Sequence, residues 1–295
     1  MNQNQWLAEQ FEENRGHLRG VAYRMLGSAS DAEDAVQESW LRLSRNGADG
    51  IANLGGWLTT VVARVCLDML RSRNSRREDP LESPVGAPPV AHPQAKMDPE
   101  TEALMADSVG LALLVVLDRL DPAERLAFVL HDLFDLPFEQ IGEIVGRSSA
   151  AARQLASRAR RRVRGAEADP GEVVTRQRRV ADRFITALRA GDVPGLVALL
   201  DPGFTVVADK TAMQAGLPQE VHGAEAWAKQ AVQAAKGARY ATTALVDGSV
   251  GIVIAPKARL FRVLRLTMVG DAITAMEVIG DRDRLRQLDL AAWSD

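Results

Sequence analysis

The chain has 295 residues, a formal net charge of −3 at pH 7, and 46% hydrophobic and 25% charged residues. This composition excludes a disordered, fibrous or uniformly basic protein, and the length predicts two or three domains rather than one. No apolar run reaches the roughly 18 residues that a membrane span needs, and the start of the chain lacks a basic flank followed by an apolar core. We therefore expect a cytoplasmic protein.

Cysteine and histidine, the residue types that most often bind zinc, are few and scattered in this sequence. Cys66 is the only cysteine and lies in an apolar run, where a buried small side chain is expected and a reactive thiol is the alternative. The four histidines have no second ligand at the spacing of zinc sites. The sequence therefore predicts no metal and no cofactor.

Residues 1–78 are predicted to form a first all-α domain, because apolar residues repeat at helical spacing. Gly27 is expected to end one helix, and Ser30 to cap the next with Glu33 completing a capping box. A third helix, expected from near Gly56, changes from an apolar face to an arginine-rich end.

Residues 79–100 are predicted to be an extended linker. The segment from Glu78 to Glu100 contains six prolines, and this density is incompatible with a helix or a central strand.

Residues 101–166 are predicted to form a second all-α domain. One helix ends at Asp121-Pro122, which also begins the next helix, PAERLAFVLHDLF. Two short helices, FEQIGEIVG and SAAARQLASRARRRVRG, then follow one another across a tight turn, as in a helix-turn-helix. Gly142 is expected to let their axes approach and Gly146 to supply the turn. Their predicted shared core consists of Ile141, Val145, Ala152 and Leu155.

Residues 172–295 are predicted to form an α+β domain. Two helical stretches lead to a strand, FTVVAD, and a further helix, AEAWAKQAVQAAKG. Four strand-like runs separated by Gly, Asp or Pro complete the chain. We expect helices to cover one face of a curved antiparallel sheet.

The second helix of the helix-turn-helix is strongly basic, and the segment from Ile144 to Ala166 contains no acidic residue. Backbone phosphates are the natural partner of such a helix, and a solvated basic face is the alternative. Base reading is expected from its N-terminal half, since Arg pairs with guanine edges and Gln with adenine edges. The predicted DNA-binding residues here are Arg147, Ser149, Ala150, Arg153, Gln154, Ser157, Arg158 and Arg161.

Two further charged clusters lie in the first domain. Arg71, Arg73, Arg76 and Arg77 close its third helix and are either a second DNA footprint or cations favoured by the helix dipole. The segment DAEDAVQES is acidic, and Asp34, Gln37, Glu38 and Leu41 share a helix face suited to a basic protein surface.

DAEDAVQESWLRL, WLTTVVARVCLDMLRSR, the proline-rich linker and LDPAERLAFVLHDLFDLPFEQIGEIVGRSSAAARQLASRARRRVR together resemble the extracytoplasmic-function group of bacterial sigma factors over roughly residues 5–165. The resemblance implies a transcription initiation factor that is not an enzyme and has no catalytic residues. Its implied partners are core RNA polymerase and promoter DNA. An anti-sigma protein or a small ligand is a further candidate partner.

The resemblance also implies roles for individual residues. Asp31, Asp34, Gln37, Glu38 and Leu41 would bind the clamp of the largest polymerase subunit. Arg64 and the arginines from Arg71 to Arg77 would help to melt and hold the upstream promoter strand. Arg153, Gln154, Ser157 and Arg158 would read the more distant promoter element.

The C-terminal segment resembles the SnoaL-like branch of the nuclear-transport-factor-two-like fold over about residues 173–290. In sigma factors with this extension, the resemblance implies that the extra domain modulates activity. One subgroup carries a Trp-Leu-Pro-Glu-Pro linker motif and an Asp-Gly-Gly-Gly-Lys motif. Here the linker reads DPLESPVGAPP, and only Asp247-Gly248 remains of the second motif.

The fold also suggests a pocket, and its candidate lining residues are Phe204, Trp227, Tyr240, Phe261 and Met276, with a plain core role as the alternative. The acids available for catalysis are Asp209, Asp247 and Glu277, and the nearby His222 is expected in a loop. Two other hypotheses remain open: a ligand-responsive DNA-binding regulator that never binds polymerase, and a cyclase or isomerase tethered to DNA.

Overall fold

The computed structural model describes residues 3–48, 50–51, 53–78, 110–164, 171–212 and 220–293. The chain divides into two compact units. The first comprises Met1–Met105 and Leu117–Arg160, and the second comprises Ala106–Val116 and Arg161–Asp295. Within the described ranges, no helix combines the length and apolarity needed to cross a membrane.

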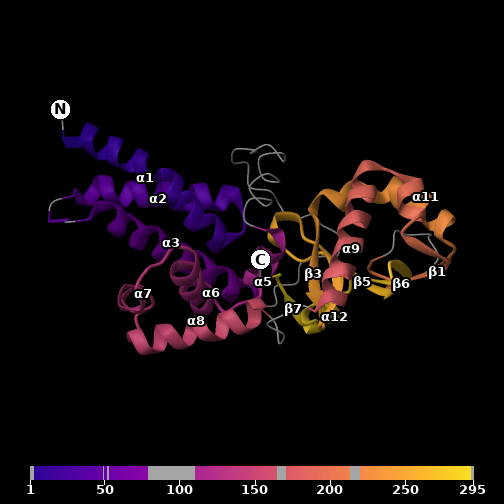
Figure 1. Ribbon diagram of the computed structural model, residues 1–295. Coiled ribbons are helices and arrows are strands. Elements are labelled where there is room, and N and C mark those ends of the chain that lie inside the picture. Colours follow the sequence, from indigo (N-terminus) through magenta and orange to yellow (C-terminus); the bar gives the residue numbers. More distant parts are fainter. Residues whose placement is uncertain are drawn as a thin grey trace. The chain divides into compact units, whose positions relative to one another are not determined.

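The N-terminal part of the first unit is a three-helix bundle of α1 (Gln3–Leu26), α2 (Ala29–Asn46) and α3 (Leu54–Glu78), which lie side by side (Figure 1). Its core is mostly aliphatic: Leu18, Met25, Leu43 and Leu58 are all buried, together with Tyr23. Apolar periodicity therefore predicted these helices correctly.

The cap of α2 corrects the sequence prediction. Ser28, and not Ser30, is the N-cap, and its side chain accepts a hydrogen bond from the backbone N–H of Asp31. Gly27, with a positive φ of 69°, ends the preceding helix, so that Ser28 is the first residue free to adopt the extended conformation of a cap.

The segment after the linker begins with α5 (Leu111–Asp118), and residues 104–109 of the expected helix lie outside the described residues. Asp121 caps α6 (Pro122–Phe128) as expected, since its carboxylate accepts a hydrogen bond from the N–H of Ala123. The single helix predicted from Pro122 onward is wrong in its second half, which forms a π-helical turn, η1 (Val129–Leu133).

From residue 171 onward, the described residues of the second unit form three helices before the main run of strands and a seven-stranded sheet. The helices are α9 (Glu172–Ala190), α10 (Val193–Val197) and α11 (Ala224–Ala234), with a 3-10 segment, η2 (Ala235–Tyr240), after α11. The strands are β1 (Leu200–Ala208), β2 (Glu220–His222), β3 (Ala241–Val246), β4 (Ser249–Ile254), β5 (Arg262–Val269), β6 (Ala272–Ile279) and β7 (Leu290–Ala291). Two short helices, η3 (Pro256–Ala258) and α12 (Arg282–Gln287), complete the unit.

The strand order is β2-β1-β6-β5-β4-β3-β7. β1 pairs with β6 in parallel, so the prediction of a wholly antiparallel sheet is wrong at this one pair. The connection from β1 to β6 runs through the rest of the domain, which permits parallel pairing. His222 is also not in a loop, because it pairs with Thr205 as the last residue of β2.

The helices cover one face of this sheet, and α9 runs across β3 and β4 (Figure 1). The core between them includes Phe184 of α9 and Phe204 of β1, both fully buried. The ring of Trp227 stacks on Phe184 and meets Phe204 edge-on, with ring centroids 5.6 and 5.4 Å apart. The predicted α+β architecture is therefore present.

Candidate nucleic-acid interface

The helix-turn-helix consists of α7 (Phe138–Val145) and α8 (Ser149–Arg164). Gly146 caps α7 in the left-handed conformation, at φ 74° and ψ 38°. A Cβ atom at Gly142 would lie 2.7 Å from the carbonyl oxygen of Arg147, so that only glycine permits this approach. The predicted shared core is also present, since Ile141, Val145, Ala152 and Leu155 are buried.

The solvent-facing side of α8 carries the predicted DNA-binding residues. Arg153, Gln154, Ser157, Arg158 and Arg161 are exposed, as is Arg147 in the turn, whereas Ser149 is half-buried. A helix that presents cations and amides on one side while its other side packs in a helix-turn-helix has the form that enters a DNA major groove.

Three arginines of α8 contact side chains of neighbouring elements. The Nε of Arg158 lies 3.0 Å from a carboxylate oxygen of Glu124 in α6. The Nε of Arg160 donates to Asp132 in η1 at 2.6 Å. The guanidinium of Arg153 lies over the ring of Phe138, 5.2 Å from its centroid.

The arginines of α3 separate into two groups. Arg64 and Arg71 are exposed, whereas Arg73 is half-buried and forms an ion pair with Asp31 of α2, 2.8 Å apart. The sequence had assigned Arg73 to DNA and Asp31 to polymerase, so the structure joins two residues that were expected to serve different partners. The side chains of Arg76 and Arg77 lie outside the described part of the chain.

The predicted polymerase-binding face lies on α2. Asp34, Gln37 and Leu41 are exposed there, and Glu38 is half-buried and paired with Arg42. Partial desolvation of its carboxyl by neighbouring atoms, together with repulsion from Asp31 and Glu33, raises the pKa of Asp34. A groove between α1 and α2 adjoins this face, and Gln37, Phe11, Val36 and Trp40 are among its lining residues.

Within the first unit, α6 is joined to the N-terminal bundle by a buried arginine. Arg125 is 2% exposed, and its Nε and Nη2 donate to the carbonyl oxygen of Arg24 at the end of α1, at 3.2 and 3.1 Å. Its Nη1 lies 3.6 Å from Asp118. Burial lowers the pKa of Arg125 to about 10, against the opposing effect of Asp118.

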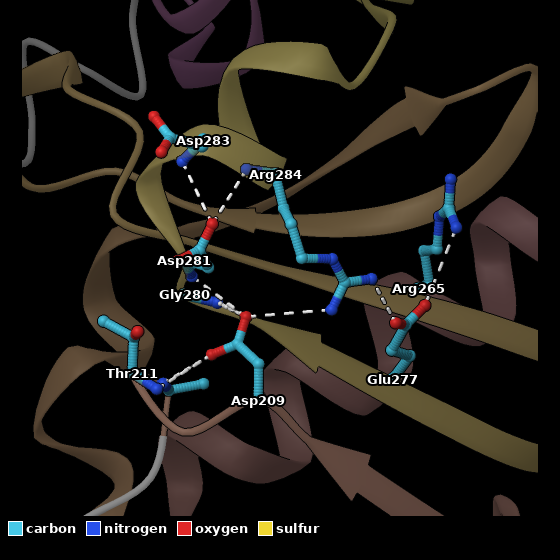
Figure 2. Close-up of polar contacts among 9 residues, drawn as sticks. Asp209, Thr211, Arg265, Glu277, Gly280, Asp281, Asp283 and Arg284 are labelled. Atoms are coloured by element: carbon cyan, nitrogen blue, oxygen red, sulfur yellow. Dashed lines mark hydrogen bonds and ion pairs between the residues drawn. The ribbon is translucent and has the colours of Figure 1, made fainter.

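Arginines join the three candidate catalytic acids of the second unit, and Figure 2 shows Arg265 and Arg284 beside Glu277 and Asp209. Arg265 pairs with both Asp247 and Glu277, and Arg284 pairs with Glu277 and lies 3.9 Å from Asp209. Carboxylates whose oxygens are already engaged by arginines are structural partners, which does not favour an acid–base role.

Asp209 also holds two loops together (Figure 2). Its Oδ1 accepts hydrogen bonds from the N–H groups of Thr211 and Ala212, at 3.1 and 2.7 Å. Its Oδ2 accepts from those of Gly280 and Asp281, at 2.8 and 2.9 Å. Although partial burial acts to raise it, these four donors lower the pKa of Asp209.

Asp247-Gly248 forms the tight turn between β3 and β4, with φ values of 49° and 78°. The Asp247 carboxylate accepts a hydrogen bond from the N–H of Asp289, 2.8 Å away. The remnant of the glycine-rich motif therefore ties the hairpin to the C-terminal segment.

The five aromatic and methionine residues proposed to line a pocket differ in their burial. Phe204 and Met276 are 0% and 2% exposed and belong to the core, where Trp227 packs against them. Phe261 is 54% exposed, and the Tyr240 ring carries the guanidinium of Arg239, 4.7 Å from the centroid. The alternative of a plain core role is therefore present for Phe204 and Met276, and a pocket shared by all five residues stays a prediction.

Sequence reasoning missed Glu124, Asp132 and Arg125. The residues that they contact are distant in the chain: Asp132 and Arg160 are 28 positions apart, and Arg125 and Arg24 are 101 positions apart. Local spacing carries no signal for such pairs.

Two family models match the chain: Sigma-70 region 2 over residues 10–76 and Sigma-70, region 4 over residues 110–163. The ECF RNA polymerase sigma factor SigJ of Mycobacterium tuberculosis is 42% identical over 217 residues, which cover 73% of this chain and 69% of that protein. The probable ECF RNA polymerase sigma factor SigI of the same species is 38% identical over 203 residues, covering 69% and 70%.

A crystal structure of Mycobacterium tuberculosis SigJ covers 94% of this chain and 98% of its own, at 34% sequence identity and a TM-score of 0.45. The sequence matches to SigJ and to both sigma-70 regions, together with the helix-turn-helix geometry, agree with the resemblance inferred from the motifs. The chain belongs to the ECF family of RNA polymerase sigma factors.

Proposed function

We propose that this chain is an alternative sigma factor that binds core RNA polymerase and directs promoter-specific transcription initiation. The observation that carries the proposal is that one chain has both an exposed basic recognition helix, α8, and an acidic and partly apolar face on α2. The family is not an enzyme class, and in this proposal the polymerase performs nucleotidyl transfer.

Within this proposal, Asp34, Gln37, Glu38 and Leu41 bind the clamp of the largest polymerase subunit. The substitution Asp34→Lys should weaken binding of the full chain to core polymerase, because it reverses a charge on this face. Glu9→Lys is a matched control, since Glu9 is an exposed acid on α1. Equal losses for the two variants would count against a specific clamp contact.

DNA contacts are assigned to two separated segments. Arg64 and Arg71 of α3 hold the upstream promoter strand, and the exposed residues of α8 read the more distant element. Each phosphate contact releases counterions, so binding should weaken steeply as salt rises. Substituting Gln154 should alter base preference, whereas substituting Arg64 should weaken binding about equally across sequences.

We also propose that residues 172–295 form a SnoaL-like domain that modulates this activity in cis. Helices covering one face of a bent sheet support the fold assignment. The ion-paired state of Asp209, Asp247 and Glu277 supports a regulatory rather than an enzymatic domain. The domain limits, 1–78, 79–100, 101–166 and 172–295, form part of the proposal.

The test is run-off transcription with purified bacterial core polymerase on a promoter library, comparing the full chain with a truncation after Gly165. Specific transcripts from the full chain would support the sigma function, and a difference between the two forms would give the sign of regulation. Equal transcription would refute modulation in cis. Salt-sensitive DNA binding without transcripts would instead favour a stand-alone regulator.

A further inference from the structure

The buried side of α8 constrains the orientation of this helix only weakly. Its buried residues within the first unit are Ala152, Leu155, Ala156 and Ala159. Three of these four are alanines, whose methyl groups form a shallow surface. Because ridges and grooves of large side chains are what fix a helix against its neighbours, an alanine-rich stripe leaves the rotation of α8 about its own axis poorly determined.

Two ion pairs flank this stripe. Arg158 and Arg160 lie on either side of Ala159, about 100° from it in each direction around the helix. Arg158 pairs with Glu124 of α6 at 3.0 Å, and Arg160 pairs with Asp132 of η1 at 2.6 Å. A contact on each side opposes rotation in either direction, so the two pairs help to fix the exact rotation of α8 about its axis.

The contact with Glu124 leaves Arg158 able to bind a partner while its guanidinium is held in place. The Glu124 side chain is 7% exposed and that of Arg158 is 48% exposed, so that the acid is fixed in the protein and the arginine reaches solvent. The contact is made through Nε, and the opposite edge of the guanidinium carries the two Nη groups. That edge is the one that binds a guanine or a phosphate in a bidentate way.

We propose that Glu124 is a positioning residue for DNA recognition, which holds Arg158 so that its Nη edge is presented to the promoter, with Asp132 acting likewise on Arg160. A guanidinium held in advance loses less conformational entropy on binding than a free one. The inference rests on the proposed sigma function. It gives Glu124 a role in DNA recognition, although the negative charge of an acid ordinarily opposes DNA binding.

Electrostatics alone predicts the opposite result, since removing an acid near DNA should strengthen binding. The variants Glu124→Leu and Glu124→Gln remove the same charge, but only glutamine keeps an oxygen that can accept from the Nε of Arg158. The difference between them therefore isolates positioning from charge. Glu143→Leu is a charge-matched control, because Glu143 is an exposed acid on α7.

The experiment uses the full chain with core polymerase. Two duplexes of equal length are compared: one enriched by the wild-type complex from a randomised library, and a scrambled version of it. The ratio of their affinities should fall about tenfold in Glu124→Leu, the order expected for one bidentate base contact, and stay within about twofold of wild type in Glu124→Gln and Glu143→Leu. Circular dichroism and thermal melting confirm folding of each variant.

A double-mutant cycle separates positioning from a merely structural role. In an Arg158→Ala background, Glu124→Leu should cause no further loss of the ratio. An undiminished loss in that background, or an unchanged ratio in Glu124→Leu alone, would overturn the inference. Absence of any sequence preference in the wild-type complex would instead refute the proposed function, so the two failures are distinguishable.

Discussion

The guanidinium of Arg125 donates two hydrogen bonds to the carbonyl oxygen of Arg24, joining α6 to the end of α1 within the first unit. The last carbonyls of a helix lack partners inside the helix and carry partial negative charge, so that a cation satisfies them well. Phe134, which follows η1, adds a second contact, because the guanidinium of Arg24 lies 5.2 Å from its ring centroid. The two sigma regions are thus packed together by polar groups as well as by apolar ones.

Replacing Arg125 should destabilise the first unit strongly. Arg125→Met fills similar volume but leaves the Arg24 carbonyl and Asp118 without their buried cation, and about 3 kcal/mol should be lost. Urea unfolding of the full chain, followed by circular dichroism, measures this. Arg147→Met in the exposed turn is the control and should change stability by no more than about 0.5 kcal/mol. Similar stability of the two variants would show that the buried contact contributes little.

Cys66 should be chemically inert in the folded protein. Burial raises the pKa of its thiol to about 12, so that almost no thiolate exists at neutral pH. Iodoacetamide at pH 8 should therefore label the native chain far more slowly than the chain in guanidinium chloride, as measured by intact mass. Rapid native labelling would show that α3 opens frequently, since the side chain is 0% exposed.

Gly142 should be intolerant of any side chain. Gly142→Ala places a Cβ atom 2.7 Å from the Arg147 carbonyl oxygen and should cost about 2 kcal/mol, with loss of promoter-specific binding as α7 and α8 separate. Gly16→Ala is the matched control in α1. No atom lies within 4 Å of its added Cβ, and the change should stabilise the helix by about 0.5–1 kcal/mol. Thermal melting and gel-shift measurements on both variants test this contrast.

Asp209 should make the second unit sensitive to acid. The pKa of its carboxyl is lower in the folded than in the unfolded chain, so the unfolded chain binds the proton first as pH falls. The stabilisation is complete above the unfolded pKa of about 3.9 and is lost as pH falls through the folded pKa. Asp209→Asn should cost about 2 kcal/mol at pH 7 and flatten the acid dependence.

Urea midpoints at pH 7 and at pH 3.5 provide the measurement for wild type and Asp209→Asn. Asp283→Asn is the control, because its side chain is 82% exposed. If Asp209→Asn kept the wild-type dependence on pH, the four backbone hydrogen bonds would not be the source of the acid sensitivity.

The amino-acid sequence by itself determined most of the described helices, the helix-turn-helix and the order of the helices and strands along the chain. These features depend on local patterns: apolar spacing, the Asp121-Pro122 start of α6, and the Gly146 turn. The outward side of α8 followed from the same periodicity, because residues three or four apart share a helix face. Family membership also followed from motifs that are continuous in the chain.

Only the tertiary structure decided which charged residues act on one another. Glu124 and Arg158, Asp31 and Arg73, and Arg125 and Arg24 are distant in sequence, and they meet because packed helices bring them together. The parallel pairing of β1 with β6 and the closure of the aromatic interior were decided in the same way. Local propensity carries no information about such contacts, since their geometry is set by the fold as a whole.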